Sequence, residues 1–120
     1  MTAIPLLRIF DYAKAREFYV DWLGFRVDWK HRFAPGIPLY VQVSREGMRL
    51  HLTEHHGDCS PGAKVFVDSQ GLPAYHRDLL ENKYAFNRPA LEVSEWNSLT
   101  MEVPDPFGNR LLFNQYHDSE

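Results

Sequence analysis

Histidine is the main residue type in this chain that could do chemistry at close spacing. His51 and His55 lie four residues apart, and the alternation of polar and apolar side chains from Arg49 to Thr53 includes His51. On an extended strand this spacing separates the two side chains by about 13 Å, which is too far for both to bind one metal ion. The segment from His51 to His55 also lacks the helical HExxH arrangement of a zinc protease. We therefore expect His51 to act through hydrogen bonds, either to a bound molecule or to neighbouring backbone and water.

Other catalytic signatures are missing from the sequence. No GxSxG elbow, GxxxxGK[ST] phosphate loop or GxGxxG fingerprint occurs. The single cysteine, Cys59, cannot form an internal disulfide or a multi-cysteine zinc site, which favours a reducing, cytoplasmic setting. The sequence therefore predicts a binding site rather than a self-contained catalytic centre.

Aromatic side chains are the clearest indication of a ligand site. Trp29, His31 and Phe33 alternate along one segment, which places them on one face of a strand, and Trp96 precedes a later strand. Such side chains stack on planar ligands, and each aromatic pair contributes about 0.5 to 1.5 kcal/mol beyond the area that it buries. The alternative is that the two tryptophans pack in the core or in a subunit interface.

Arginines accompany the aromatic residues on the predicted strands. If His51 faces a cavity, Arg49 shares its face, and the same counting places Arg110 and Leu112 on the inner face of the last strand. Arginines in these places can hold carboxylate or phosphate groups through two hydrogen bonds. The alternative is that they pair with internal acids such as Glu102 or reach solvent at the strand ends.

The first half of the chain must position these residues on a meander of strands. Asp11 stands at the N-cap of a helix predicted over 12–23, whose apolar residues follow helical spacing. This inward stripe consists of Ala15, Phe18, Tyr19 and Trp22. Strands are predicted before and after the helix, over 4–10, 26–33, 39–44 and 48–54.

The second half repeats this order. It predicts a strand over 64–67, a helix over 72–83, and strands over 90–93, 98–103 and 110–115. The segment from Gly47 to Leu52 can be laid over that from Gly108 to Phe113 with Gly, Arg and Leu in step. We therefore expect a single α+β domain of two βαβββ modules, about 1–56 and 62–120, whose curled mixed sheet surrounds a cleft.

Composition restricts the partners of this domain. Thirteen Lys and Arg against sixteen Asp and Glu leave a net charge of −3, so there is no basic excess for a nucleic acid. No run approaches the ~18 apolar residues of a membrane span, and the N-terminus does not have the pattern of an export signal. We expect a cytoplasmic protein that binds neither nucleic acid nor membranes.

The sequence resembles the vicinal oxygen chelate superfamily, which includes glyoxalase I, extradiol dioxygenases, fosfomycin resistance enzymes and bleomycin resistance proteins. The resemblance covers essentially the full chain. It rests on Ala3-Ile4-Pro5-Leu6-Leu7 leading to Asp11, on Phe18-Tyr19 through Leu23-Gly24-Phe25, and on Trp96 with Asp105-Pro106-Phe107-Gly108-Asn109. The opening Ala-x-Pro-x-Leu and the tryptophan nine residues before Asp105 look most like the bleomycin resistance branch.

The resemblance also gives a test for a metal site. Metal-dependent members carry their ligands at four places, which fall here on Ile4, on His51, near Gly62 or Lys64, and on Leu112. Only His51 among these can bind a divalent metal, and such a metal needs about three protein ligands. We therefore expect no metal and no other cofactor.

The bleomycin resistance branch implies a homodimer with ligand clefts at its interface. Its members exchange the N-terminal strand between subunits next to a proline, and Pro5 matches that place. Bleomycin-like ligands are cationic and carry a planar bithiazole, so carboxylates would suit them. The carboxylates available for this role are Asp28, Glu54, Glu92, Glu95 and Glu102.

Our prediction is a metal-free, non-catalytic protein that binds and sequesters a small planar or glycopeptide antibiotic. The candidate ligand-binding residues are Trp29, His31, Phe33, Arg49, His51, Trp96, Glu102 and Leu112. One alternative is an enzyme, either a metal-dependent lyase, dioxygenase or thiol transferase of the same superfamily, or a metal-free relative with His51 as general base. The other is a scaffold or regulatory module that binds no small molecule.

Overall fold

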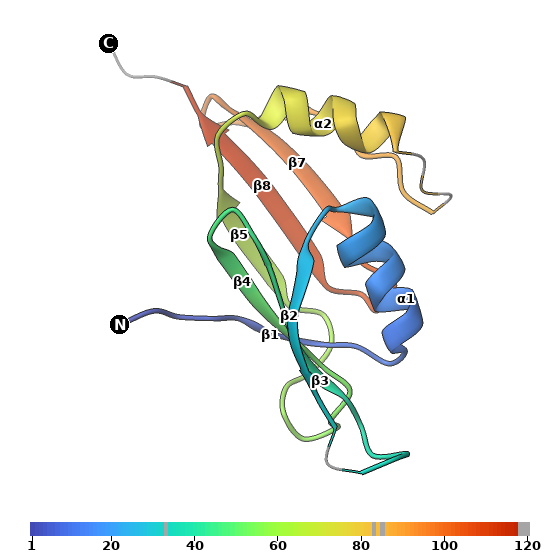
Figure 1. The fold of residues 1–120 in the computed structure, drawn as a ribbon. Coiled ribbons are helices and arrows are strands. Elements are labelled where there is room, and N and C mark those ends of the chain that lie inside the picture. The colour runs from blue at the N-terminus through green and yellow to red at the C-terminus, as the bar shows by residue number, and fades with distance from the viewer. Residues whose placement is uncertain (33, 83, 85, 118–120) are drawn as a thin grey trace. The chain divides into compact units, whose positions relative to one another are not determined.

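The computed structural model describes residues 1–32, 34–82, 84 and 86–117 and divides into two compact units. The first unit holds Met1–Ala63 and Asp105–Asn109, and the second holds Lys64–Pro104 and Arg110–Glu120. Each unit contains one four-stranded mixed sheet (Figure 1). The α+β fold with two βαβββ modules is therefore confirmed, but its strands form two separate sheets rather than one curled sheet.

The sheet of the first unit has the strand order β1-β4-β3-β2, with β1 parallel to β4 and the other pairs antiparallel. Its strands are β1 (Leu6–Arg8), β2 (Arg26–His31), β3 (Tyr40–Arg45) and β4 (Met48–Thr53). Glu46 and Gly47 join β3 to β4, and both have positive φ, 49° and 83°. Such a pair is typical of a two-residue hairpin, because this turn matches the twist of the strands.

The helical segment of the first unit begins as predicted but changes its hydrogen bonding. Asp11 accepts from the backbone N–H of Ala13 and of Lys14 and so caps α1 (Tyr12–Arg16). The chain then continues as a π-helical segment, η1 (Glu17–Trp22), rather than as a regular α-helix. Three large rings pack together on this segment, since Phe18 meets Tyr19 and Trp22 at centroid distances of 4.8 and 5.5 Å. The predicted inward stripe is confirmed as buried.

The second unit has the strand order β5-β8-β7-β6, with β5 parallel to β8. Its elements are β5 (Lys64–Asp68), α2 (Leu72–Glu81), β6 (Glu92–Val93), β7 (Ser98–Pro104) and β8 (Arg110–Tyr116). α2 runs beside β7 and β8 in Figure 1, and the ring of Tyr75 packs edge-on against Phe113 at 5.5 Å. No helix in the described part of the chain is long and apolar enough to cross a membrane.

Alternation along β3 and β4 separates a buried face from a polar face in the first sheet. Val41 and Val43 of β3, with Leu50 and Leu52 of β4, are at most 1% exposed. The residues between them, His51 among them, point to the other face. The first strand is shorter than the predicted range 4–10, since β1 covers only Leu6–Arg8.

The turn Asp105–Asn109 is held by a buried carboxylate. One oxygen of Asp105, Oδ1, accepts from the backbone N–H of Phe107 and of Asn109, both at 2.8 Å. The other, Oδ2, accepts from Tyr19 Oη at 2.7 Å and from Asn109 Nδ2 at 2.9 Å. Burial and the Asp105 carboxylate raise the pKa of Tyr19, so its hydroxyl stays protonated as a donor. This part of the sequence signature therefore has a structural role.

Candidate ligand-binding site

The strand register arranges nine side chains of the first sheet in three rows on its polar face. These rows are Arg26, Ser44 and Arg49, then Trp29, Gln42 and His51, then His31, Tyr40 and Thr53. Residues directly opposite each other on neighbouring strands share a face and interact. A bulge between Val27 and Trp29 adds one residue to β2 and leaves Asp28 between the first two rows.

A chain of hydrogen bonds crosses this polar face. Tyr40 Oη lies 2.7 Å from His51 Nδ1, and His51 Nε2 lies 2.9 Å from Gln42 Oε1. Gln42 Nε2 then donates to Asp28 Oδ2 at 3.0 Å. A carboxylate only accepts, so Gln42 must turn its nitrogen to Asp28 and its oxygen to His51. The proton of a neutral His51 is thereby placed on Nε2, and Nδ1 accepts from Tyr40.

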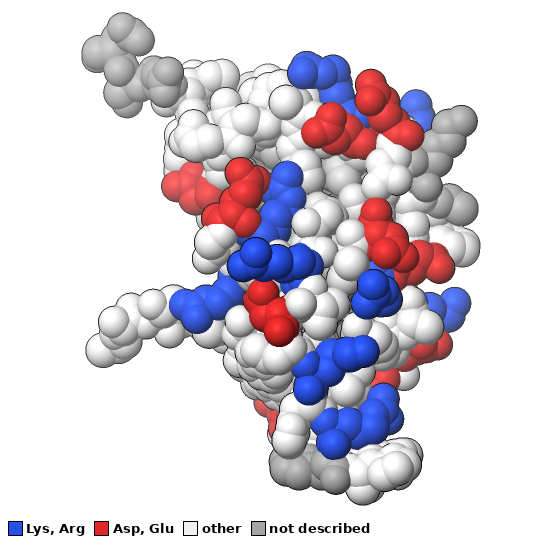
Figure 2. Space-filling view, viewed as in Figure 1, with Lys and Arg blue, Asp and Glu red and all other residues white. Residues whose placement is uncertain are grey.

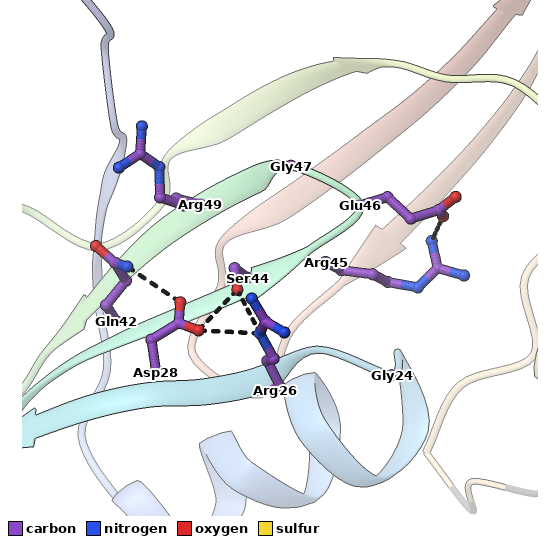
Figure 3. Close-up of a pocket in the computed structure, with 9 residues that line it drawn as sticks. All are labelled: Gly24, Arg26, Asp28, Gln42, Ser44, Arg45, Glu46, Gly47 and Arg49. Atoms are coloured by element: carbon purple, nitrogen blue, oxygen red, sulfur yellow. Dashed lines mark hydrogen bonds and ion pairs between the residues drawn. The ribbon is translucent and has the colours of Figure 1, made fainter.

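Asp28 anchors the far end of this chain (Figure 3). Its carboxylate also accepts from Ser44 Oγ at 2.9 Å and from Arg26 Nε at 3.1 Å. Hydrogen bonds from Gln42 and Ser44 are the main reason why the pKa of Asp28 lies below its ordinary value. The negative charge of Asp28 is therefore compensated by its own neighbours.

Three rings form an aromatic cluster on the polar face: Trp29, Tyr40 and His51. The ring of Trp29 lies nearly parallel to that of Tyr40, at a centroid distance of 6.0 Å and an interplanar angle of 7°. His51 meets Trp29 edge-on at 5.3 Å and Tyr40 edge-on at 5.1 Å. Trp29 is 42% exposed, so part of this cluster is open to solvent in the described chain.

We expect the imidazole of His51 to titrate below its ordinary pKa of 6.5. Burial, and then the positive charge of Arg49, both disfavour the imidazolium and so lower the pKa of His51. The unfolded chain binds this proton more readily, so the stability contribution is complete above pH 6.5 and declines as the pH falls through the lowered pKa. NMR titration of the imidazole nitrogens measures both pKa and tautomer.

The variant Arg49→Gln tests whether the positive charge of Arg49 lowers the pKa of His51. It is expected to move the pKa of His51 back toward 6.5 without changing the Nε2–H tautomer. A wild-type pKa at or above 6.5 would contradict the effect of burial and of Arg49, and a proton resident on Nδ1 would contradict the hydrogen-bond chain.

A pocket of about 660 Å³ lies over the first of the three rows (Figure 3). Its charged lining residues are Arg26, Asp28, Arg45, Glu46 and Arg49. Arg26 pairs with Asp28, and Arg45 pairs with Glu46. Within the described part of the chain no ion pair or hydrogen bond involves the side chain of Arg49, which is exposed. The pocket is therefore cationic by one charge.

The first unit brings together four of the predicted site residues. Trp29, His31, Arg49 and His51 all belong to the three rows. Phe33 lies outside the described residues. Sequence reasoning did not identify the three β3 residues of these rows as site residues, although alternation around Val41 and Val43 places them on the face opposite the core. Those residues are Tyr40, Gln42 and Ser44.

The second unit holds the other three predicted residues. Glu102 and Leu112 are register partners on β7 and β8. Trp96 is 53% exposed and donates from Nε1 to Asn114 Oδ1 at 3.1 Å, so within its own unit it is not a core residue. The predicted pairing of an arginine with an internal acid is confirmed for Arg110, whose Nη1 lies 3.6 Å from Glu102 Oε2.

The expectation of free carboxylates for a cationic ligand is not met at three of the five residues. Glu54 accepts from the backbone N–H of Tyr12 and of Leu39 with its two oxygens. Asp28 belongs to the hydrogen-bond chain, and Glu102 pairs with Lys64 at 2.9 Å. On the face shown in Figure 2, acidic side chains likewise lie beside basic ones. Backbone donors and basic neighbours therefore already use these oxygens.

The residues at the four predicted metal-ligand places do not fit a metal ion. The β1 residue opposite His51 is Leu6 rather than Ile4, and the β5 residue opposite Leu112 is Phe66. Leucine and phenylalanine have no lone pair to donate. Among the described residues no three His, Cys, Asp or Glu side chains come together where they could hold a metal ion. That the protein works without a metal stays a prediction.

These two four-stranded modules define the class of protein. The family model of the glyoxalase superfamily matches residues 1–120, so the chain belongs to the glyoxalase superfamily. The resemblance to this superfamily seen in the sequence is confirmed. No protein of curated function matches the chain in sequence.

Solved structures of antibiotic-binding and antibiotic resistance proteins share the fold. A bleomycin-binding protein complexed with bleomycin is 20% identical, with a TM-score of 0.75 over 98% of this chain and 99% of that one. A bleomycin resistance determinant encoded on the transposon Tn5 is 19% identical, with the same TM-score and coverage. TnmS3, an antibiotic-binding protein from Streptomyces sp. CB03234, is 22% identical, with a TM-score of 0.68 over 98% of both chains. At these identities the likeness establishes the fold.

Proposed function

We propose that this protein binds and sequesters a small planar molecule, an antibiotic or a related metabolite, without a metal. The observation that carries the proposal is the aromatic cluster of Trp29, Tyr40 and His51 beside the pocket of the first sheet. A planar ligand gains stacking contacts on such a surface while losing little freedom of its own.

The hydrogen-bond chain supports binding over catalysis. It holds Tyr40 and His51 in place before any ligand arrives, and pre-organised contacts cost less on binding. Both ring nitrogens of His51 already have partners within the protein, so a ligand would have to displace Tyr40 or Gln42 to bond directly to the imidazole. Similar structures that are described as binding antibiotics point the same way.

A homodimer with exchange of the N-terminal strand at Pro5 belongs to the same proposal. β1 is an edge strand of three residues, and Pro5 has no N–H to contribute to the sheet. Such a short strand is easily transferred to the sheet of a second copy. Sedimentation equilibrium of the wild-type chain and of a chain shortened before Ile9, which lacks β1, tests this part: a dimer that persists without β1 would refute exchange of this strand as the basis of dimerisation.

The function is tested by thermal-shift measurements with planar ligands, together with metal analysis. We expect planar heteroaromatic compounds in a panel with bleomycin and phleomycin to raise the melting temperature of the wild-type protein. The variant His51→Ala is expected to bind the same compounds more weakly with no change in metal content. Near-stoichiometric iron, manganese, nickel or zinc after dialysis would overturn the proposal, as would a panel in which no compound stabilises the protein.

A further inference from the structure

The first row, which lines the pocket and carries two arginines, lies next to the aromatic cluster. Arg26, Ser44 and Arg49 lie side by side across β2, β3 and β4, and the next row along the strands contains Trp29 and His51. Arg49 precedes His51 by two residues on the same face of β4, so their Cα atoms are about 6.6 Å apart. A single small ligand can therefore contact both rows.

Only part of the positive charge of Arg26 and Arg49 is paired with acidic groups among the described residues. Arg26 donates from Nε to Asp28 and to Ser44, and its side chain is 82% exposed. Within the described ranges no partner is recorded for the terminal nitrogens of Arg26 or for any part of the guanidinium of Arg49. In Figure 3 the side chain of Arg49 extends from β4 and no dashed line reaches it. An arginine fork of this kind matches a carboxylate, which it can hold through two hydrogen bonds.

The acidic residues beside this row do not offset its preference for an anion. The carboxylate of Asp28 accepts from Gln42, Ser44 and Arg26, so it has little capacity left for a cation. Glu46, at the turn between β3 and β4, pairs with Arg45. A cationic ligand would meet the uncompensated charge of Arg49, whereas an anionic ligand would neutralise it.

We propose that the ligand of this site is a planar aromatic carboxylate, whose ring lies against Trp29 and whose carboxylate is held by Arg49 with help from Arg26. This inference rests on the proposed function and narrows its ligand class. It makes a cationic glycopeptide such as bleomycin a poorer ligand of this pocket than an aromatic acid of small size.

Three probes with the same ring test the inference by isothermal titration calorimetry. They are 2-naphthylacetate, its neutral amide 2-naphthylacetamide, and the cation 2-(2-naphthyl)ethylammonium. We expect the wild-type protein to bind the acetate about tenfold more tightly than the amide, and the cation more weakly than both. Raising the salt concentration should reduce the affinity for the acetate and leave that for the amide nearly unchanged.

The variant Arg49→Gln should bind the acetate no better than the amide. Arg77→Gln is the matched control, because it removes the same charge from an exposed position on α2 in the second unit. This control should keep the tenfold preference for the acetate over the amide. Both variants should melt at the wild-type temperature, because neither arginine side chain has an ion pair or hydrogen bond among the described residues.

The outcomes separate this inference from the proposed function. Equal affinity for the three probes, or a preference that survives in Arg49→Gln, would overturn the inference and leave planar-ligand binding in place. Failure of all three probes to bind the wild-type protein would overturn both. A preference for the acetate that is lost in Arg49→Gln and kept in Arg77→Gln supports both.

Discussion

Replacing Asp105 by asparagine is expected to lower the free energy of unfolding by about 3 kcal/mol. The carboxylate of Asp105 is 7% exposed and accepts four hydrogen bonds, from Tyr19 Oη, Phe107 N, and the backbone and side chain of Asn109. An amide at this place turns one acceptor into a donor, which then faces either the backbone N–H groups of Phe107 and Asn109 or the side-chain Nδ2 of Asn109. Chemical denaturation measures the loss, and the melting temperature should fall by about 10 °C.

Two further variants identify the cause of that loss. Tyr19→Phe removes one of the four hydrogen bonds and should cost about 1.5 kcal/mol. The double variant should lose less than the sum of the single losses, because both changes delete the same bond. Asp68→Asn is the matched control at an exposed position on β5 and should stay within about 0.5 kcal/mol of the wild type. A stable Asp105→Asn protein would show that the turn does not depend on this carboxylate.

Replacing Trp29 by alanine is expected to weaken the binding of a planar ligand by about tenfold to a hundredfold. The indole supplies the exposed wall of the aromatic cluster, and stacking of one planar ring on such a side chain is worth about 1–3 kcal/mol. Trp29→Phe keeps a flat ring and should recover most of the affinity. Calorimetry with 2-naphthylacetamide measures the change, because this neutral probe reports on the ring contact without the charge of Arg49.

The control for Trp29 is a second exposed aromatic residue. Phe86 is 78% exposed and lies in the second unit, so Phe86→Ala should leave the affinity for the probe unchanged. The melting temperature of Trp29→Ala should fall only slightly, because the indole is already 42% exposed. Unchanged affinity in Trp29→Ala would place the planar ligand elsewhere and remove the basis of the proposed function.

Sequence patterns were sufficient for the elements and for the direction of most side chains. Alternation predicted that His51 and Arg49 share the face opposite Leu50 and Leu52, and the spacing of Phe18, Tyr19 and Trp22 predicted a buried helical stripe. The switch to π-helical hydrogen bonding in η1 was not predictable in this way. The switch changes the backbone hydrogen-bond partners in η1, but the same apolar side chains remain buried. A hydrophobic pattern indicates which side chains are buried and does not indicate which carbonyl each N–H bonds to.

The candidate site was predicted only in part, because its members come from different strands. Trp29, Arg49 and His51 were identified, but Tyr40 and Gln42, which hold His51, were not. Knowing that a side chain points away from the core does not tell which residue on the next strand lies opposite it. That partner depends on the register, which the long connection between β2 and β3 does not specify.

The amino-acid sequence by itself determined the two βαβββ modules, the cap at Asp11 and the face on which His51 lies, since these depend on neighbours along the chain. Only the tertiary structure decided that Asp28, Gln42, His51 and Tyr40 form one hydrogen-bond chain and that no acid among the described residues pairs with Arg49. The physical reason is that hydrogen bonds and ion pairs act over about 3 to 4 Å. Contacts this short depend on strand register and on the bulge before Trp29, and both arise from pairing between segments far apart in the sequence.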